Sequence, residues 1–173
     1  ISIERNRDGK FSFEFEKPDT VGETLPVLGL ARISLSGGTL RYADKQSGEG
    51  FEAGNCRLEV RRLRLSGGEI LDFMKNLSFT AEVACGSIRK NDITVSDLKF
   101  SAQGADGVVD LKPVTMYVFG ARGSGNIRAN FLGAVPRYHV RYSLPQFRIE
   151  EVFKTLASNK AAEGPMDLAV NLS

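Results

Sequence analysis

The chain has 173 residues, of which 42% are hydrophobic and 25% charged, values close to those of an average soluble domain. This composition excludes a disordered tail, a collagen and a membrane-spanning bundle, and no run of about 18 apolar residues predicts a transmembrane helix. The formal net charge is only +2, which gives no reason to expect a nucleic-acid partner. One His and two Cys are too few for a zinc site, so we expect neither a metal nor a cofactor.

The length predicts one domain that is long enough to build its own core. The sequence starts at Ile1 rather than Met and stops at Ser173, directly after an alternating apolar segment. We therefore expect residues 1–173 to be a single β-rich domain that is a piece of a longer protein.

Most of the chain alternates apolar and polar residues with a period of two, which is typical of strands with one buried face. The alternation is unbroken in 77–83, 138–144 and 166–172. Glycine-containing turns between such short segments predict an antiparallel meander. The other predicted strands are about 9–16, 31–35, 39–43, 51–65, 92–102, 106–111, 114–119 and 123–132.

Two of these strands change their apolar phase midway, one at Arg61-Arg62 and the other at Asp97. A β-bulge at each position would keep both halves of the strand facing the same core, and bulges bend a sheet. The predicted fold is therefore mainly β, with a curved antiparallel sheet that is half-barrel or groove-like.

One helix is predicted over 147–156, near the C-terminus. Ile149, Val152, Phe153 and Leu156 recur at the spacing of one helix face, and we expect them to pack on one end of the sheet. A shorter second helix is predicted over 70–77. The segments 32–40 and 62–70 are similar in sequence, which indicates either two similar turns or a repeated hairpin.

No constellation predicts catalysis, so we expect no enzyme. His139 lies on the polar side of its strand. Glu150 and Glu151 are adjacent on a helix and point about 100° apart, so they predict a solvated helix start rather than an acid–base pair. A strand, not a helix, follows the glycines of 120–125, which favours a hairpin over a phosphate-binding loop.

Two clusters have two interpretations each. Four arginines in 57–64 either attract anionic lipid headgroups or guard an outward strand face against edge pairing. Cys56 and Cys85 share the apolar phase of their strands, so they are either a disulfide or two buried thiols.

The strand predicted over 114–119 is apolar on both sides. Val114, Met116 and Val118 form one row, while Tyr117 and Phe119 lie in the other. We expect such a strand to be covered on both faces. With only one clear helix available as a cover, some apolar surface would remain for a ligand or partner.

The order of several short motifs resembles that of the AsmA family of Gram-negative envelope proteins. The motifs are Asn6 to Phe11, Ser36 to Asp44, Ala105 to Pro113, Phe119 to Phe131, Pro136 with its alternating strand, the 147–156 helix, and Gly164 to Asp167. The resemblance covers nearly the whole chain. It departs from the family at Phe11-Ser12-Phe13, where a Trp is often found.

This resemblance implies a non-catalytic, periplasmic segment of a protein attached to the inner membrane by an anchor outside this piece. Such proteins belong with bridge-like lipid transfer proteins, whose apolar groove binds acyl chains during phospholipid transport to the outer membrane and outer-membrane biogenesis. The periplasm is oxidising, so the resemblance favours a disulfide between Cys56 and Cys85. The alternative is an interaction scaffold that assists outer-membrane protein assembly, with envelope protein partners that stay undefined.

If the groove exists, its lining is expected on the apolar rows of the C-terminal half. The 147–156 helix joins two alternating strands, so these strands are expected to be neighbours. The candidate lipid-binding residues are Val114, Met116, Val118, Ile127, Phe131, Tyr138, Val140, Tyr142, Leu144, Met166, Leu168 and Val170.

Overall fold

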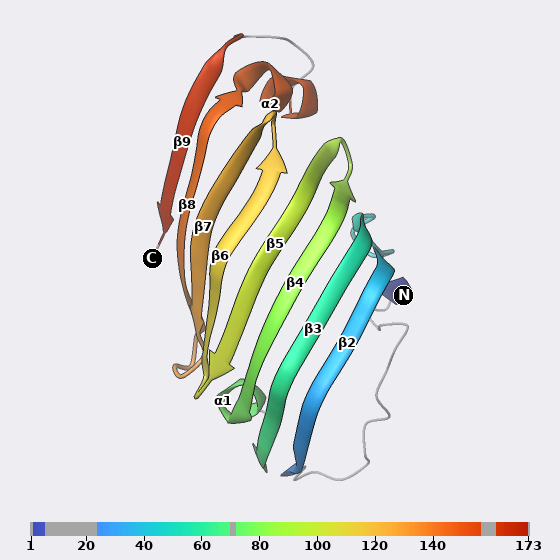
Figure 1. The fold of residues 1–173 in the computed structure, drawn as a ribbon, viewed down its shortest axis with the longest axis vertical. Helices are drawn as coiled ribbons and strands as arrows, with labels where there is room; N and C mark the ends of the chain where they lie inside the picture. The colour runs from blue at the N-terminus through green and yellow to red at the C-terminus, as the bar shows by residue number, and fades with distance from the viewer. Residues whose placement is uncertain (1, 6–23, 70–71, 157–161, 173) are drawn as a thin grey trace.

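The computed structural model describes residues 2–5, 24–69, 72–156 and 162–172. In this part of the chain, nine strands form one open sheet in sequence order, and all neighbours are antiparallel except β1 and β2 (Figure 1). The mainly β fold with a small helix near the C-terminus is thus confirmed. The strands are β1 Ser2–Arg5, β2 Thr24–Asp44, β3 Gly50–Glu69, β4 Leu77–Lys90, β5 Ile93–Ala105, β6 Val108–Val118, β7 Ala121–Asn130, β8 Arg137–Arg148 and β9 Pro165–Leu172; the helices are α1 Phe73–Asn76 and α2 Ile149–Leu156.

Several predicted strands are longer than expected, because glycines that predicted turns lie inside strands. The segments 31–35 and 39–43 belong to the single strand β2, whose pairing with β3 shifts on both sides of Gly38. Gly37 has φ of +66°, a conformation that glycine adopts readily, so the strand continues through the irregularity. The similar glycines of the second repeat, Gly67 and Gly68, also lie within β3. The interpretation of the repeat as two turns is therefore wrong. The predicted strands 106–111 and 114–119 also merge into one strand, β6, which continues through Lys112-Pro113 and starts after the Asp106-Gly107 turn.

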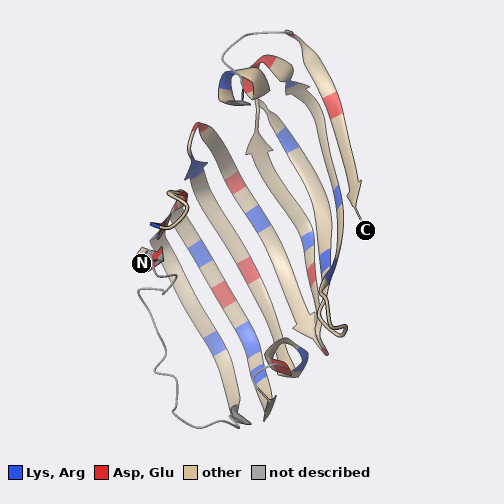
Figure 2. Cartoon of the chain, turned by 180° about the vertical axis from the view of Figure 1, so that it is seen from behind, with Lys and Arg blue, Asp and Glu red and all other residues tan. Residues whose placement is uncertain are grey.

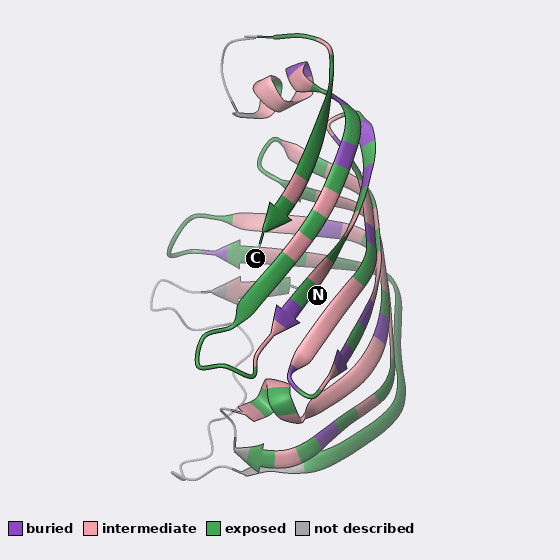
Figure 3. Cartoon of the chain, turned by 90° about the vertical axis from the view of Figure 1, so that its left-hand side faces the viewer, coloured by how far each residue is buried: buried purple, intermediate pink, exposed green. Residues whose placement is uncertain are grey.

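Both predicted phase switches are bulges. Arg62 has φ of 54°, and the pairing of β3 with β4 shifts between Arg61 and Arg64. Asp97 has φ of 51°, and the pairing of β5 with β6 shifts between Ser96 and Lys99. Each extra residue resets the alternation, so apolar side chains stay on one face. The strands bend along their length, and α2 lies on the inner side of the bend (Figure 3).

Helix α2 starts two residues later than predicted, because Phe147 and Arg148 still pair with β9. Ile149 and Val152 pack on a buried cluster at the end of the sheet. The cluster consists of Val118, Ala121, Leu144 and Phe147. Phe153 is half-buried.

Other predictions at the ends of elements have mixed outcomes. The second helix is shorter than the predicted 70–77, because α1 has only four residues. Residues 70–71, the side chain of Leu156 and the strand predicted over 9–16 lie outside the described part.

The ring of Tyr142 lies across two glycines of β7. A Cβ atom on Gly123 would meet the Tyr142 hydroxyl, and one on Gly125 would meet both the Tyr142 ring and the Arg141 carbonyl oxygen. Burial raises the pKa of the Tyr142 hydroxyl, which has no hydrogen-bond partner among the described residues. The two glycines therefore leave the space that the Tyr142 ring occupies on the apolar face.

We expect Gly125→Ala to lower the free energy of unfolding by about 1–3 kcal/mol, because the new methyl group overpacks a site bounded by backbone. Urea denaturation measures this change. Gly29→Ala is the matched control, because nothing lies within 4 Å of the position of its Cβ, and it should change stability by less than about 0.5 kcal/mol. Equal effects of the two substitutions would contradict the proposed packing.

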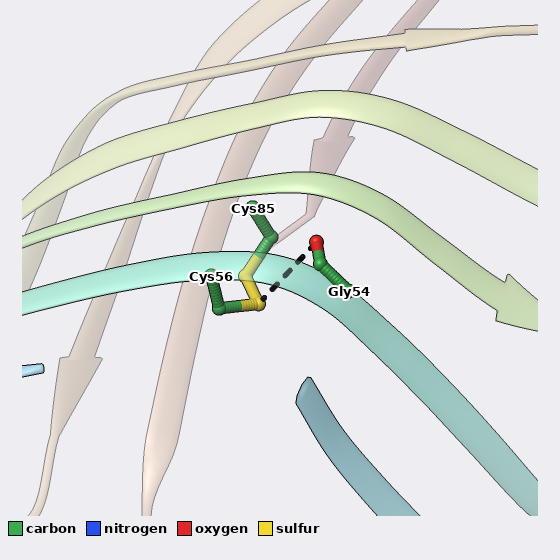
Figure 4. The surroundings of a disulfide bond; sticks show 3 residues. All are labelled: Gly54, Cys56 and Cys85. Atoms are coloured by element: carbon green, nitrogen blue, oxygen red, sulfur yellow. Dashed lines mark hydrogen bonds between the residues drawn. A yellow bond between two sulfur atoms is a disulfide. The ribbon is translucent and has the colours of Figure 1, made fainter. Parts of the chain in front are cut away.

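A disulfide links the middle of β3 to the middle of β4 (Figure 4). The Sγ atoms of Cys56 and Cys85 are 2.10 Å apart, and their Cα atoms are 4.0 Å apart. The two residues are direct partners in the β3–β4 register. The separation lies well within the upper limit of about 7 Å for bridging two cysteines, as the pairing hypothesis requires.

Replacing both cysteines by Ala should lower the free energy of unfolding by about 3 kcal/mol, because the bond closes a loop of 29 residues in the unfolded chain. Denaturation with and without reductant measures the effect. The double variant serves as its own control, since reductant should destabilise the parent chain and leave the variant unchanged. A parent chain that is insensitive to reductant would contradict a stabilising bond.

Candidate functional site

One unbroken row of apolar residues crosses the sheet from β2 to β9. Each member is the register partner of the next, so the row contains one residue from each of eight strands. Its members are Ile33, Val60, Ala81, Ala102, Leu111, Ile127, Val140 and Leu172. The adjacent register row, on the opposite face, is polar and runs Arg32, Arg61, Thr80, Gln103, Asp110, Arg128, His139.

A second row widens the apolar face. In β2–β5 it consists of Leu35, Leu58, Val83 and Phe100, which pair in that order. In β6–β9 it consists of Val114, Gly125, Tyr142 and Val170. These rows and the eight-residue row together form what we call the apolar face.

The twelve candidate residues predicted from the sequence lie on β6–β9 or directly after β7. Ile127 and Val140 belong to the eight-residue row, and Val114, Tyr142 and Val170 to the second row. Met116 and Val118 continue along β6, Leu144 pairs with Leu168, and Met166 pairs with Phe147. Phe131 makes an edge contact with Tyr138, their ring centroids being 6.4 Å apart.

Sequence reasoning missed the half of the apolar face on β2–β5. The signal was present, since 77–83 alternates and the phase switches at Arg62 and Asp97 preserve one apolar side. What the sequence lacks is the register, which aligns Leu58 with Val83 and Val83 with Phe100.

Little covers the apolar face in the described part of the chain. No large side chain there is fully buried, and a cluster of buried residues lies where α2 meets the sheet. Toward the C-terminal edge, Leu172 is 60% exposed and Leu168 is 44% exposed. Figure 3 shows long stretches of intermediate and exposed residues along the strands. The face is therefore an open apolar surface.

The opposite face is charged and solvated, and ion pairs connect its strands. Glu59 accepts from Arg61 at 2.6 Å and lies 3.0 Å from Arg32, while Arg128 lies 3.4 Å from Asp110. Figure 2 shows that residues of both charges are distributed over the strands. The hydrogen bond from Arg61 lowers the pKa of Glu59. The expected double coverage of the 114–119 strand is wrong, because Tyr117 is 43% exposed on this face.

Two hollows of the molecule are lined mainly by residues outside the apolar rows, although Val83 and Phe100 contribute to the first. One of about 510 Å³ lies over the charged face, where Arg57, Glu82 and Lys99 line it. Another of about 600 Å³ lies beside α2, between Tyr117 and Glu151. The apolar rows thus form an open surface rather than an enclosed pocket. The described residues contain no group of His, Cys, Asp and Glu that could hold a metal ion.

Glu150 is buried, so its interpretation as a solvated helix residue is wrong. Arg148 Nε donates to one of its carboxylate oxygens at 2.6 Å, and the Gly164 backbone N–H donates to the other at 3.2 Å. The N–H of Ile149 also donates to the Gly164 carbonyl at 3.2 Å. Glu150 therefore ties the start of β9 to α2, and both of its oxygens are occupied.

The other catalytic candidates behave as expected from the sequence. Glu151 contacts Lys154 at 2.7 Å, and His139 is exposed on the charged face. The glycines of 120–125 form the β6–β7 hairpin and the start of β7.

Comparison with models of protein families, with curated proteins and with solved structures gives no match. No helix within the described residues is both long and apolar enough to span a membrane.

We expect Glu150 to stabilise the contact between α2 and β9 in a pH-dependent manner. Its own backbone N–H, Arg148 and Gly164 lower its pKa from 4.5 to about 2. A lowered carboxyl pKa contributes stability that is complete above pH 4.5 and is lost as the pH falls toward 2. Glu150→Gln should therefore flatten the loss of stability in this window.

Urea denaturation at several pH values between 7 and about 2 measures this effect. Glu151→Gln, one residue away, is the matched control and should keep the parent pH profile, because Glu151 does not bond to the β9 segment. If the two variants show the same profile, the Glu150 contacts do not stabilise the fold.

Proposed function

We propose that this chain binds phospholipid acyl chains along its apolar face, as a non-catalytic segment of an envelope protein that carries phospholipid toward the outer membrane. The observation that carries the proposal is the eight-residue apolar row, which crosses from β2 to β9 with little covering it in the described part. In this proposal the bent sheet is a groove-like half-barrel, and the acyl chains lie on its inner side.

The dimensions of the row suit an acyl chain. Neighbouring strands are spaced by about 4.8 Å, so a row across eight strands extends over roughly 34 Å. One leaflet of a bilayer contributes about 15 Å of hydrocarbon, so the row is longer than a single acyl chain. A continuous apolar surface of this extent is unfavourable in water and needs a lipid or a partner to cover it.

Chemistry and sequence motifs support the proposed compartment. The Cys56–Cys85 bond suits an oxidising environment such as the periplasm. The resemblance of the motifs to the AsmA family supports attachment of the longer protein to the inner membrane. An interaction scaffold for outer-membrane protein assembly is the alternative, and it would cover the apolar face with protein instead of lipid.

We expect the chain to co-purify with phospholipid and Val140→Glu to lose most of it. Val140 lies on β8, between Ile127 and Leu172 of the eight-residue row. A charge on an open face reaches water, so the fold should survive, while an acyl chain cannot cover the carboxylate without a desolvation cost of several kcal/mol. Native mass spectrometry measures the bound lipid, and circular dichroism measures the fold.

Ser143→Glu is the matched control, because Ser143 is exposed on the charged face of the same strand. It should leave the bound lipid unchanged, whereas Val170→Glu on β9 should repeat the loss. An unfolded Val140→Glu variant would identify the row as ordinary core, and folded protein with unchanged lipid would contradict the proposal. A chain that carries no lipid but retains a protein partner would favour the scaffold.

A further inference from the structure

The connection between β7 and β8 is an exposed apolar loop. Residues 131–136 contain no charged side chain, and Leu132 is 55% and Val135 74% exposed. The connection at the opposite end of the sheet between β2 and β3, by contrast, is polar and includes Lys45 and Glu49. The exposed apolar connection thus lies at one end of the sheet, and we call the end that contains residues 131–136 the loop end.

Hydrogen bonds and packing hold this loop in place. The Phe131 N–H donates to the Gly107 carbonyl at 2.7 Å, and the Leu132 N–H donates to the Asn130 side chain at 2.9 Å. A Cβ atom on Gly107 would meet both Leu132 and Lys75 of α1, so the loop lies beside this helix (Figures 1 and 2). Phe73 of α1 is also exposed. The apolar side chains of the loop end therefore belong to a fixed surface built from two elements.

The loop end also carries the excess positive charge of the described residues. The register places 24–32, 61–69, 72–80, 103–110 and 128–139 at this end, from the Arg61 row outward. These ranges contain seven Lys or Arg and four Asp or Glu, a net charge of +3, whereas the other described residues contain twelve of each. Arg137, which follows the apolar loop, is exposed and makes no ion pair within the described part.

From this arrangement we propose that the loop end docks on the surface of an anionic lipid bilayer. Leu132 and Val135 enter the boundary between headgroups and acyl chains, while Arg137 contacts phosphate groups. An apolar tip flanked by basic residues is the combination that binds membrane surfaces. Tyr138, which is 54% exposed directly behind the tip, adds an aromatic ring at the depth where membrane interfaces favour one.

A bilayer fits this surface better than a protein partner. The exposed apolar tip is small. The basic residues of the loop end lie on several strands behind it, and they do not form one cluster that could face a single acidic site of a protein partner. A diffuse positive charge of this kind matches a continuous layer of negative headgroups. The docked end would place one margin of the apolar face next to lipid, and this last step alone rests on the proposed acyl-chain function.

Vesicle flotation with the 173-residue chain tests the docking. We expect the chain to float with vesicles of phosphatidylcholine and phosphatidylglycerol, and less with phosphatidylcholine alone. The double variant Leu132→Asn/Val135→Asn should lower the partition coefficient at least tenfold, because two apolar side chains no longer enter the bilayer. Arg137→Gln should lower it about fivefold, only on vesicles that contain phosphatidylglycerol.

Tyr117→Ser is the control, since it removes an exposed aromatic residue from the charged face outside the loop end and should not change flotation. A chain that fails to float with either vesicle, or a double variant that floats like the parent, would overturn the docking proposal. Binding of a protein instead of vesicles would also overturn it.

Native mass spectrometry of the same samples separates this proposal from the acyl-chain function. The double variant should keep its co-purified lipid, because neither substituted residue belongs to the apolar face. A parent chain that floats but carries no lipid would support docking while contradicting the acyl-chain proposal.

Discussion

The structure depends on one constraint: a single-layer sheet sorts its side chains to two faces, and only in-register pairing keeps each face uniform. Eight strands contribute apolar residues to one row, and seven of them contribute polar residues to the next. A slip of one residue in any strand would bring its apolar set to the charged face. The bulges at Arg62 and Asp97 reset the alternation within long strands, so they are necessary for a continuous apolar face.

Side-chain size varies along that face, and this variation explains how an open sheet attains local packing. The small residues Ala81 and Ala102 pair with each other between Val60 and Leu111 and are buried, and Gly125 lies against the Tyr142 ring. Larger residues then form the surface, with Tyr142 as the clearest case. The stability of the apolar face therefore comes from lateral contacts within one layer, together with the cover that α2 supplies at one end.

The sequence predicts the local features of this fold and misses those that depend on distant partners. The alternation of apolar and polar residues predicts the strands, and the phase change at Asp97 predicts a bulge, because each pattern depends on only a few consecutive residues. Gly37 was misread as a turn, because a left-handed glycine serves a hairpin and a bulge equally well. The burial of Glu150 was missed, since it depends on Gly164, which follows 14 residues later. The β2–β5 half of the candidate site was missed for a similar reason, as only the register aligns its rows.

The meander topology also determines how the molecule comes apart. From β2 to β9, each strand hydrogen-bonds only to its sequence neighbours, so the sheet approximates a linear array of nearest-neighbour interfaces. In such an array, opening starts at the ends and spreads inward, as in a zipper, and amide protection decreases from the middle strands to the margins. Among the described strands, β9 pairs with β8 alone, whereas the disulfide between β3 and β4 makes that interface the hardest to separate. In the described part of the chain, opening that starts at β9 thus passes β8, β7, β6 and β5 before it reaches the disulfide-linked pair.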